Sequence, residues 1–171
     1  INWYTSRKMY VMIDMHQDVY SAFVGGNGAP EWACRTKGAA PINLPGGTPW
    51  WLKNIDQQVI NCWINFWSYN QHKDLQEHYI LTWQKIAERF KNNPYVIGYD
   101  LMNEPWGGDL VKVFLTGEFE RVQLTAFYNR LIPALRNTDP NKYIFFEPTP
   151  APVTFGAPSN LSSIKDTRNS A

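Results

Sequence analysis

The stretch VIGYDLMNEP, residues 96–105, combines two features that together indicate the fold. Its first half is an apolar run typical of a strand that is buried on both faces of a parallel sheet. Its second half ends in Asn103, Glu104 and Pro105. In parallel α/β folds, functional groups gather at the carboxyl ends of the strands. A carboxylate at this position therefore predicts a ligand-binding or active site.

Two further apolar runs end in the same way. Residues 9–15, MYVMIDM, are followed by His16 and Asp18, and residues 143–148, YIFFEP, finish with Glu147 and a proline. Polar residues end most strands, so one such residue means little. Three successive strand ends that carry His/Asp, Asn/Glu and Glu favour a shared site at one edge of a sheet.

Helical patterns separate these runs. A helix of about 18 residues is predicted from Asp74 to the Asn92-Asn93-Pro94 stop, and a second from about residue 118 to 137, with a bend at Pro133. The first ten residues resemble the tail of a helix that runs into a strand. Strands that alternate with helices predict βαβ units, a parallel sheet and the α/β fold class.

Residues 19–55 contain no such pattern. The segment is rich in Gly and Pro and carries Trp32, Trp50 and Trp51. Long loops in compact domains are usually functional or disordered, and disordered segments rarely carry so many aromatic residues. We expect residues 19–55 to form a binding loop.

The composition limits the classes of partner. The chain of 171 residues is 44% apolar and 18% charged, and it has no apolar stretch long enough to predict a transmembrane segment. Its net charge of +1, without a Lys/Arg cluster, predicts no nucleic-acid partner. The eight Trp, nine Tyr and nine Phe exceed the needs of one small core, and aromatic rings suit the apolar faces of sugars as well as cores.

The two cysteines, Cys34 and Cys62, are expected in a loop-like region. Their spacing matches no zinc motif, so neither a metal nor a cofactor is predicted. A disulfide between them would fit a secreted protein, and the sequence leaves this pairing open. The tripeptide Asn160-Leu161-Ser162 is an acceptor pattern for N-glycosylation and weakly favours the same compartment.

The chemistry that suits these residues is cleavage of a glycosidic bond. That reaction uses two carboxyl groups, one to protonate the leaving oxygen and one to attack the anomeric carbon or activate water. Glu104, at a crowded strand terminus, is a candidate acid, and the Asn103 amide can hold a sugar hydroxyl. The alternative for the Asn-Glu-Pro tripeptide alone is a turn with a solvated glutamate.

The same residues carry a family resemblance. VIGYDLMNEP resembles the acid/base strand of glycoside hydrolase family 5, a retaining family on the (β/α)8 barrel. The longer run VMIDMHQDVYSAFVGGNGAPEWA, residues 11–33, is similar to the endoglycoceramidase group of that family. Enzymes of this group release intact glycans from glycosphingolipids by cutting the bond to ceramide.

The resemblance implies a role for each matching residue. Glu104 becomes the general acid/base, and Asn103 contacts the 2-hydroxyl of the sugar beside the scissile bond. His16 and Asp18 become substrate-binding groups of the same subsite. Trp67 matches an aromatic residue that packs on sugar, although a place in the core remains the alternative for this side chain.

The strand spacing and the family resemblance predict different roles for Glu147. Neighbouring strands lie about 4.8 Å apart, so spacing alone selects Glu147 as the nucleophile that pairs with Glu104. The resemblance instead equates the three strands with the third to fifth of a TIM barrel and places the nucleophile on the seventh. Glu147 is then a residue of the substrate pocket, and the nucleophile is not in this chain.

On this basis we expect residues 1–171 to be the central part of a single TIM-barrel domain, truncated at both ends and stopping at 169–171 before a sixth strand. The predicted function is a retaining hydrolase of the glycan–ceramide bond, inactive as the isolated piece. The expected partners are a glycosphingolipid or another β-glycoside and the surface of a lipid layer or micelle. The expected location is secreted or lysosomal.

Three alternatives remain open at this point: a β-glucosidase of glucosylceramide or steryl glucosides, a β-glucanase of the same family, and a catalytically silent barrel that binds carbohydrate or lipid.

Overall fold

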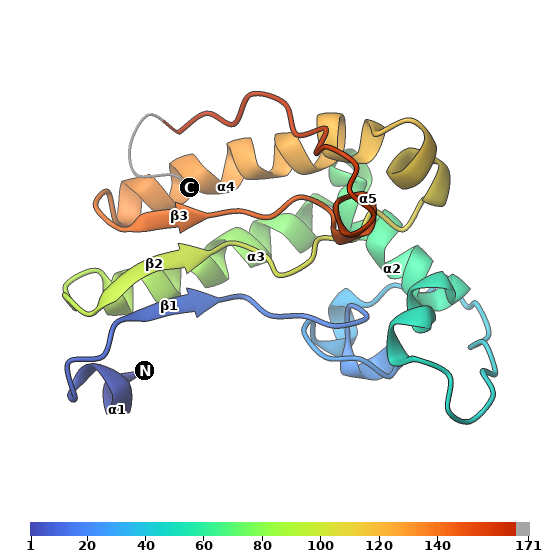
Figure 1. The fold of residues 1–171 in the computed structure, drawn as a ribbon, viewed down its shortest axis with the longest axis horizontal. Helices are drawn as coiled ribbons and strands as arrows, with labels where there is room; N and C mark the ends of the chain where they lie inside the picture. Colours follow the sequence, from blue (N-terminus) through green and yellow to red (C-terminus); the bar gives the residue numbers. More distant parts are fainter. Residues whose placement is uncertain (167–171) are drawn as a thin grey trace.

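The computed structural model describes residues 1–166, and three parallel strands in the order β1-β2-β3 form its sheet. Helices α3 and α4 lie together on one side of this sheet (Figure 1). The elements are α1 (Asn2–Thr5), β1 (Val11–Asp14), η1 (Ala22–Val24), η2 (Glu31–Ala33), η3 (Trp50–Ile55), α2 (Gln57–Trp67), α3 (Tyr69–Phe90), β2 (Val96–Asp100), η4 (Val111–Leu115), η5 (Phe119–Leu124), α4 (Thr125–Thr138), β3 (Tyr143–Phe145) and α5 (Pro150–Thr154).

The strand register assigns the polar side chains to one face of the sheet. Tyr99 pairs with Ile144, and its ring packs edge-on against Trp83 of α3, so this row faces the helices. Side chains alternate between the faces of a strand. The next row, in which Asp14 pairs with Asp100, therefore points to the face away from α3.

An aromatic core fills the space between the sheet and the helices. Half of the eight tryptophans are buried in it, namely Trp63, Trp67, Trp83 and Trp106. The other half, Trp3, Trp32, Trp50 and Trp51, are exposed. The aromatic excess in the sequence thus has two origins, a ring-rich core and a set of exposed indoles.

The strands and the second long helix confirm the predicted alternation. Each strand is shorter than the predicted run, which covered residues 9–15, about 95–102 and 143–148 respectively. Residues 118–137 are helical as predicted, with a π-helical first part, η5, that continues into α4. Pro133 is accommodated inside α4. The amino-terminal helix is also confirmed, as α1.

Two helical features differ from the prediction. Helix α3 begins at Tyr69 and contains a non-helical residue, His72, so the predicted start at Asp74 lies just after this kink. Helix α2 was not predicted. Its start is set by Asp56, which accepts a hydrogen bond from the Gln58 N–H at 2.9 Å. The segment 19–55 is irregular as expected, except for the short helices η1, η2 and η3.

Within residues 1–166, no helix has the length and apolar character needed to cross a bilayer. Residues 169–171, where we expected the chain to stop before a sixth strand, lie outside the described part.

Candidate active site

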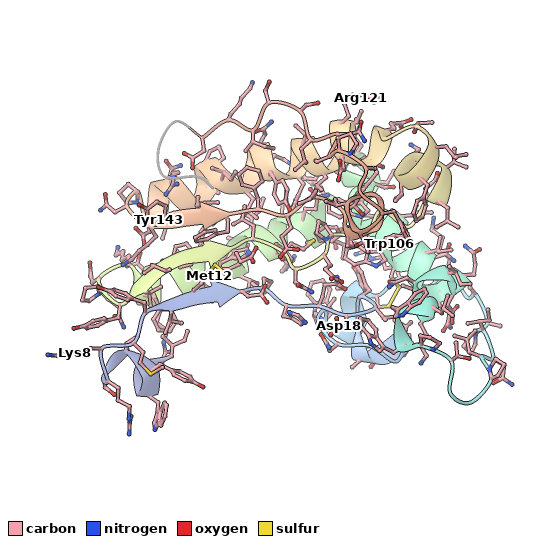
Figure 2. All side chains as sticks on the ribbon, viewed as in Figure 1. Lys8, Met12, Asp18, Trp106, Arg121 and Tyr143 are labelled. Atoms are coloured by element: carbon pink, nitrogen blue, oxygen red, sulfur yellow. A yellow bond between two sulfur atoms is a disulfide. The ribbon has the colours of Figure 1, made fainter. Side chains whose placement is uncertain are left out.

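The polar residues predicted from the strand ends come together beyond the carboxyl ends of the strands. Figure 2 labels Asp18 and Trp106 on this side of the molecule, and Lys8 and Tyr143 near the opposite end of the strands. The fold brings five of the six predicted site residues to this edge, namely His16, Asp18, Asn103, Glu104 and Glu147. Trp67 lies apart from them.

Glu147 contacts the backbone of Glu104, whereas the strand spacing predicted an approach of the two carboxyl groups. The Glu104 backbone N–H donates to Glu147 Oε2 at 2.8 Å. Glu104 has a positive φ of 43°, an uncommon conformation for a non-glycine residue. The crowding expected around Glu104 is not found, because Glu104 is exposed.

Gln17 links the ends of β1 and β2, a role that sequence reasoning missed. Its Nε2 donates to the backbone carbonyls of Asn103 at 3.1 Å and Glu104 at 3.2 Å. In return, Asn103 Nδ2 donates to the Gln17 carbonyl at 3.0 Å. Its position between His16 and Asp18 was the available signal.

His16 lies between two carboxylates. Its Nδ1 is 2.8 Å from Asp14 Oδ2, and its Nε2 is 3.3 Å from Asp18 Oδ2. The hydrogen bond to Asp14 is the main reason why the pKa of His16 is raised, and the charges of both aspartates add to it. Asp18 also accepts from Asn27 Nδ2 at 2.8 Å. The imidazole is therefore oriented by fixed partners and favours its protonated form.

Asp100 is the carboxyl group with the strongest perturbation in the site, and it was not predicted. It is 8% exposed, and burial is the main cause that raises its pKa to about 6. The charges of Glu147 and Asp14, and a side-chain hydrogen bond with Glu147, act in the same direction. Asp100 is the last residue of the β2 run VIGYD, where an acidic residue at a strand end was the signal.

Trp67 is part of the core. It is 4% exposed, its indole stacks on Trp63, and its Nε1 donates to the Trp106 carbonyl at 2.7 Å. An edge-on contact with Phe119 closes another side. The structure supports the core alternative for Trp67 and leaves no ring face open to a sugar.

Cys34 and Cys62 form a disulfide, with their Cα atoms 4.9 Å apart. Cys62 lies in α2 and is buried, so the expected loop-like setting is wrong for this residue. Asn160, the predicted glycosylation acceptor, is exposed. In the described part of the chain, no group of three or more His, Cys, Asp and Glu side chains has an arrangement that could hold a metal ion.

A parallel sheet with helices on its outer side and paired carboxyl groups at the strand ends has the architecture of a barrel glycosidase. Comparison with known proteins defines the family. The chain belongs to glycosyl hydrolase family 5: the cellulase model of this family matches residues 1–151. The resemblance inferred from the sequence is thus confirmed, and the three strands are part of a (β/α)8 barrel.

Several of the similar proteins are endoglycoceramidases. The endoglycoceramidase of Hydra vulgaris is 30% identical over 162 residues, which cover 81% of this chain and 31% of the relative. The endoglycoceramidase I of Rhodococcus hoagii is 34% identical over 163 residues, which cover 92% and 31%. A solved structure of endo-glycoceramidase II from Rhodococcus sp. superposes with a TM-score of 0.87 at 39% identity, covering 98% of this chain and 38% of that one.

The same Rhodococcus enzyme has been solved as a complex with ganglioside GM3, and this structure matches equally well, with a TM-score of 0.87. The chain spans about a third of the length of these curated relatives, 31% of each.

Proposed function

We propose that the polypeptide containing this chain is a retaining glycoside hydrolase that cleaves the bond between the glycan and the ceramide of glycosphingolipids. The observation that carries the proposal is the Asn103–Glu104 pair at the carboxyl end of β2, inside the segment that matches the family. The names of the similar proteins and the ganglioside complex of one of them support the substrate class.

In the proposed mechanism, Glu104 donates a proton to the glycosidic oxygen as the bond to ceramide breaks. A carboxylate attacks the anomeric carbon and forms a glycosyl-enzyme. Glu104 then takes a proton from the water that hydrolyses this intermediate, so the configuration is retained. Asn103, His16 and Asp18 are assigned to the hydroxyl groups of the sugar beside the scissile bond.

Glu147 does not suit the role of the attacking carboxylate. Its Oε2 accepts the Glu104 N–H, and its carboxyl group is also hydrogen-bonded to Asp100. The family resemblance places the nucleophile on the seventh strand of the barrel, whereas Glu147 follows β3, which corresponds to the fifth. We therefore place the nucleophile in a part of the polypeptide outside these 171 residues.

A secreted or lysosomal location is also part of the proposal. It is supported by the Cys34–Cys62 disulfide, because such bonds persist in oxidising compartments, and by the exposure of Asn160. The exposed indoles of Trp50 and Trp51, in the short helix η3 that precedes α2, support contact with a lipid surface or micelle.

The test is Glu104→Gln in the longest natural polypeptide that contains this chain. Loss of the proton donor should lower kcat/KM on a glycosphingolipid by about a hundredfold or more. The control is Glu88→Gln, an exposed glutamate of α3 that forms a surface salt bridge with Lys91. Activity of Glu104→Gln within about tenfold of wild type would overturn the proposal.

The mass of the released sugar, measured by mass spectrometry, identifies the bond that is cut. The proposal requires the intact glycan, whereas release of glucose alone would favour a β-glucosidase.

A further inference from the structure

The backbone of Glu104 is held in a conformation that it would not adopt unaided. Its φ of 43° lies in the left-handed region, which side chains other than glycine rarely occupy. Such a residue keeps its conformation only when its surroundings fix it. Gln17 holds its carbonyl from the β1 side, and Glu147 holds its N–H from the β3 side.

Glu147 is in turn held by Asp100. The strand register places Asp100 opposite Phe145, two residues before Glu147, and both the charge and the side chain of Glu147 act to raise the pKa of Asp100. A hydrogen bond between two carboxyls requires a proton on one of them, because two carboxylates repel each other. Asp100 Oδ1 is buried and meets no N–H or O–H donor among residues 1–166, so nothing else there offsets a negative charge on this atom.

We propose that Asp100 and Glu147 form a proton-sharing pair that positions Glu104: Glu147 anchors the Glu104 N–H, and Asp100 holds the Glu147 carboxyl in place. The inference rests on the proposed function, in which Glu104 is the general acid/base. Asp100 and Glu147 act as positioning residues in this account, since they work through Glu104.

The groups around the pair favour a single shared proton. From the β1 side, Asp14 adds negative charge, and His16 is hydrogen-bonded to Asp14. From the helices, the Tyr79 hydroxyl of α3 donates to the Leu101 carbonyl next to Asp100, and Tyr128 of α4 contacts the Glu147 backbone. Burial raises the pKa of both phenols well above the ordinary value, so they stay neutral.

The Tyr128 hydroxyl donates to the Glu147 carbonyl at 2.7 Å. This hydrogen bond fixes the Glu147 backbone, so only the Glu147 side chain can move when the protonation of the pair changes.

The pKa of Asp100, raised to about 6, sets the pH range in which the pair loses its proton. Below this value the pair carries its proton and Glu147 is held. As the pH rises through it the proton leaves, the two carboxylates repel, and Glu104 loses its anchor. Part of the alkaline loss of activity is therefore assigned to the pair.

Three variants of the longest natural polypeptide test this. Glu147→Gln keeps an oxygen that accepts the Glu104 N–H, and its amide gives Asp100 an N–H donor at every pH. In Asp100→Asn, the new amide likewise gives the Glu147 carboxylate an N–H donor at every pH. Both should move the alkaline midpoint of kcat/KM upward by about half a pH unit or more. Glu147→Ala removes the anchor, and Glu147→Gln should recover most of the activity that it loses.

The leaving group separates positioning from a general structural role. Proton donation matters for a poor leaving group such as ceramide and little for dinitrophenolate. Glu147→Ala should therefore lower kcat/KM by about tenfold or more on a glycosphingolipid and by less than about threefold on a dinitrophenyl glycoside. Thermal melts report whether each variant is folded.

The outcomes are distinct. Equal losses on both substrates, or an unmoved alkaline midpoint in both Glu147→Gln and Asp100→Asn, would overturn the inference. If Glu147→Ala does not fold, the two conservative variants still decide it. A hundredfold loss in Glu104→Gln with wild-type behaviour of the pair variants would remove the inference alone, whereas activity in Glu104→Gln would remove the proposed function.

Discussion

At the scale of single residues, Trp67 shows how a motif match and a packing position can compete for one side chain. The family resemblance assigns it to a sugar, yet its ring lies between Trp63, Phe66 and Phe119, and its N–H is used by the Trp106 carbonyl. A buried carbonyl that loses its donor costs about 1–3 kcal/mol. Trp67 therefore contributes to stability before it contributes to binding.

We predict that Trp67→Phe lowers the free energy of unfolding of the longest natural polypeptide by about 1–3 kcal/mol and leaves KM nearly unchanged. Denaturant titration and steady-state kinetics measure the two quantities. The matched control is Trp3→Phe, an exposed indole of α1, which should change neither. A large rise in KM with unchanged stability would show that Trp67 binds sugar after all.

The site residues that could be predicted are those that follow an apolar run directly, namely His16, Asp18, Asn103, Glu104 and Glu147. Asp100 and Gln17 were missed for a physical reason. An acidic residue that closes an apolar run looks like its solvated end, and only the strand register shows that Asp100 shares a row with Asp14. The role of Gln17 depends on contacts with residues more than 80 positions away along the chain.

At the scale of elements, the strands and the helices α3 and α4 could be predicted because their apolar residues repeat with a clear period. Helix α2 could not, because its sequence, QQVINCWINFW, mixes asparagine, β-branched and aromatic residues with modest helix propensity. Packing and the Asp56 cap decide its conformation. The disulfide then ties this helix to the loop that precedes it, joining residues 28 positions apart.

We predict that the double variant Cys34→Ala/Cys62→Ala is less stable to unfolding by about 2–4 kcal/mol, because the bond restricts the unfolded chain. Denaturant titration of the longest natural polypeptide with and without reductant checks this. Reductant should destabilise the wild type and have no effect on the double variant. Equal stability of the two proteins under oxidising conditions would contradict the assignment.

At the scale of the whole molecule, the sheet is open on one face and at both edges. Asp14 and Asp100 point to the face away from α3, and β1 and β3 each pair with β2 alone in residues 1–166. Several large apolar side chains are exposed, among them Tyr10, Tyr143 and Phe155. Open edges and uncovered apolar surface favour association over an independent monomer.

We predict that the 171 residues alone show no cooperative thermal transition and no turnover of a β-glycoside. Calorimetry and an aryl glycoside assay are sufficient measurements, with the longest natural polypeptide as the positive control. A single cooperative transition together with measurable hydrolysis would show that the three βα units are self-sufficient, and it would return Glu147 to consideration as the nucleophile.

The central claim is that Glu104 is the acid/base of a retaining hydrolase, and azide rescue tests it most directly. Glu104→Ala in the longest natural polypeptide is assayed on a dinitrophenyl β-glycoside with and without azide. A small anion enters the space left by the carboxyl group and attacks the glycosyl-enzyme without a general base. We expect a severalfold rise in kcat with azide and a β-glycosyl azide as product; no acceleration and no azide adduct would contradict the claim.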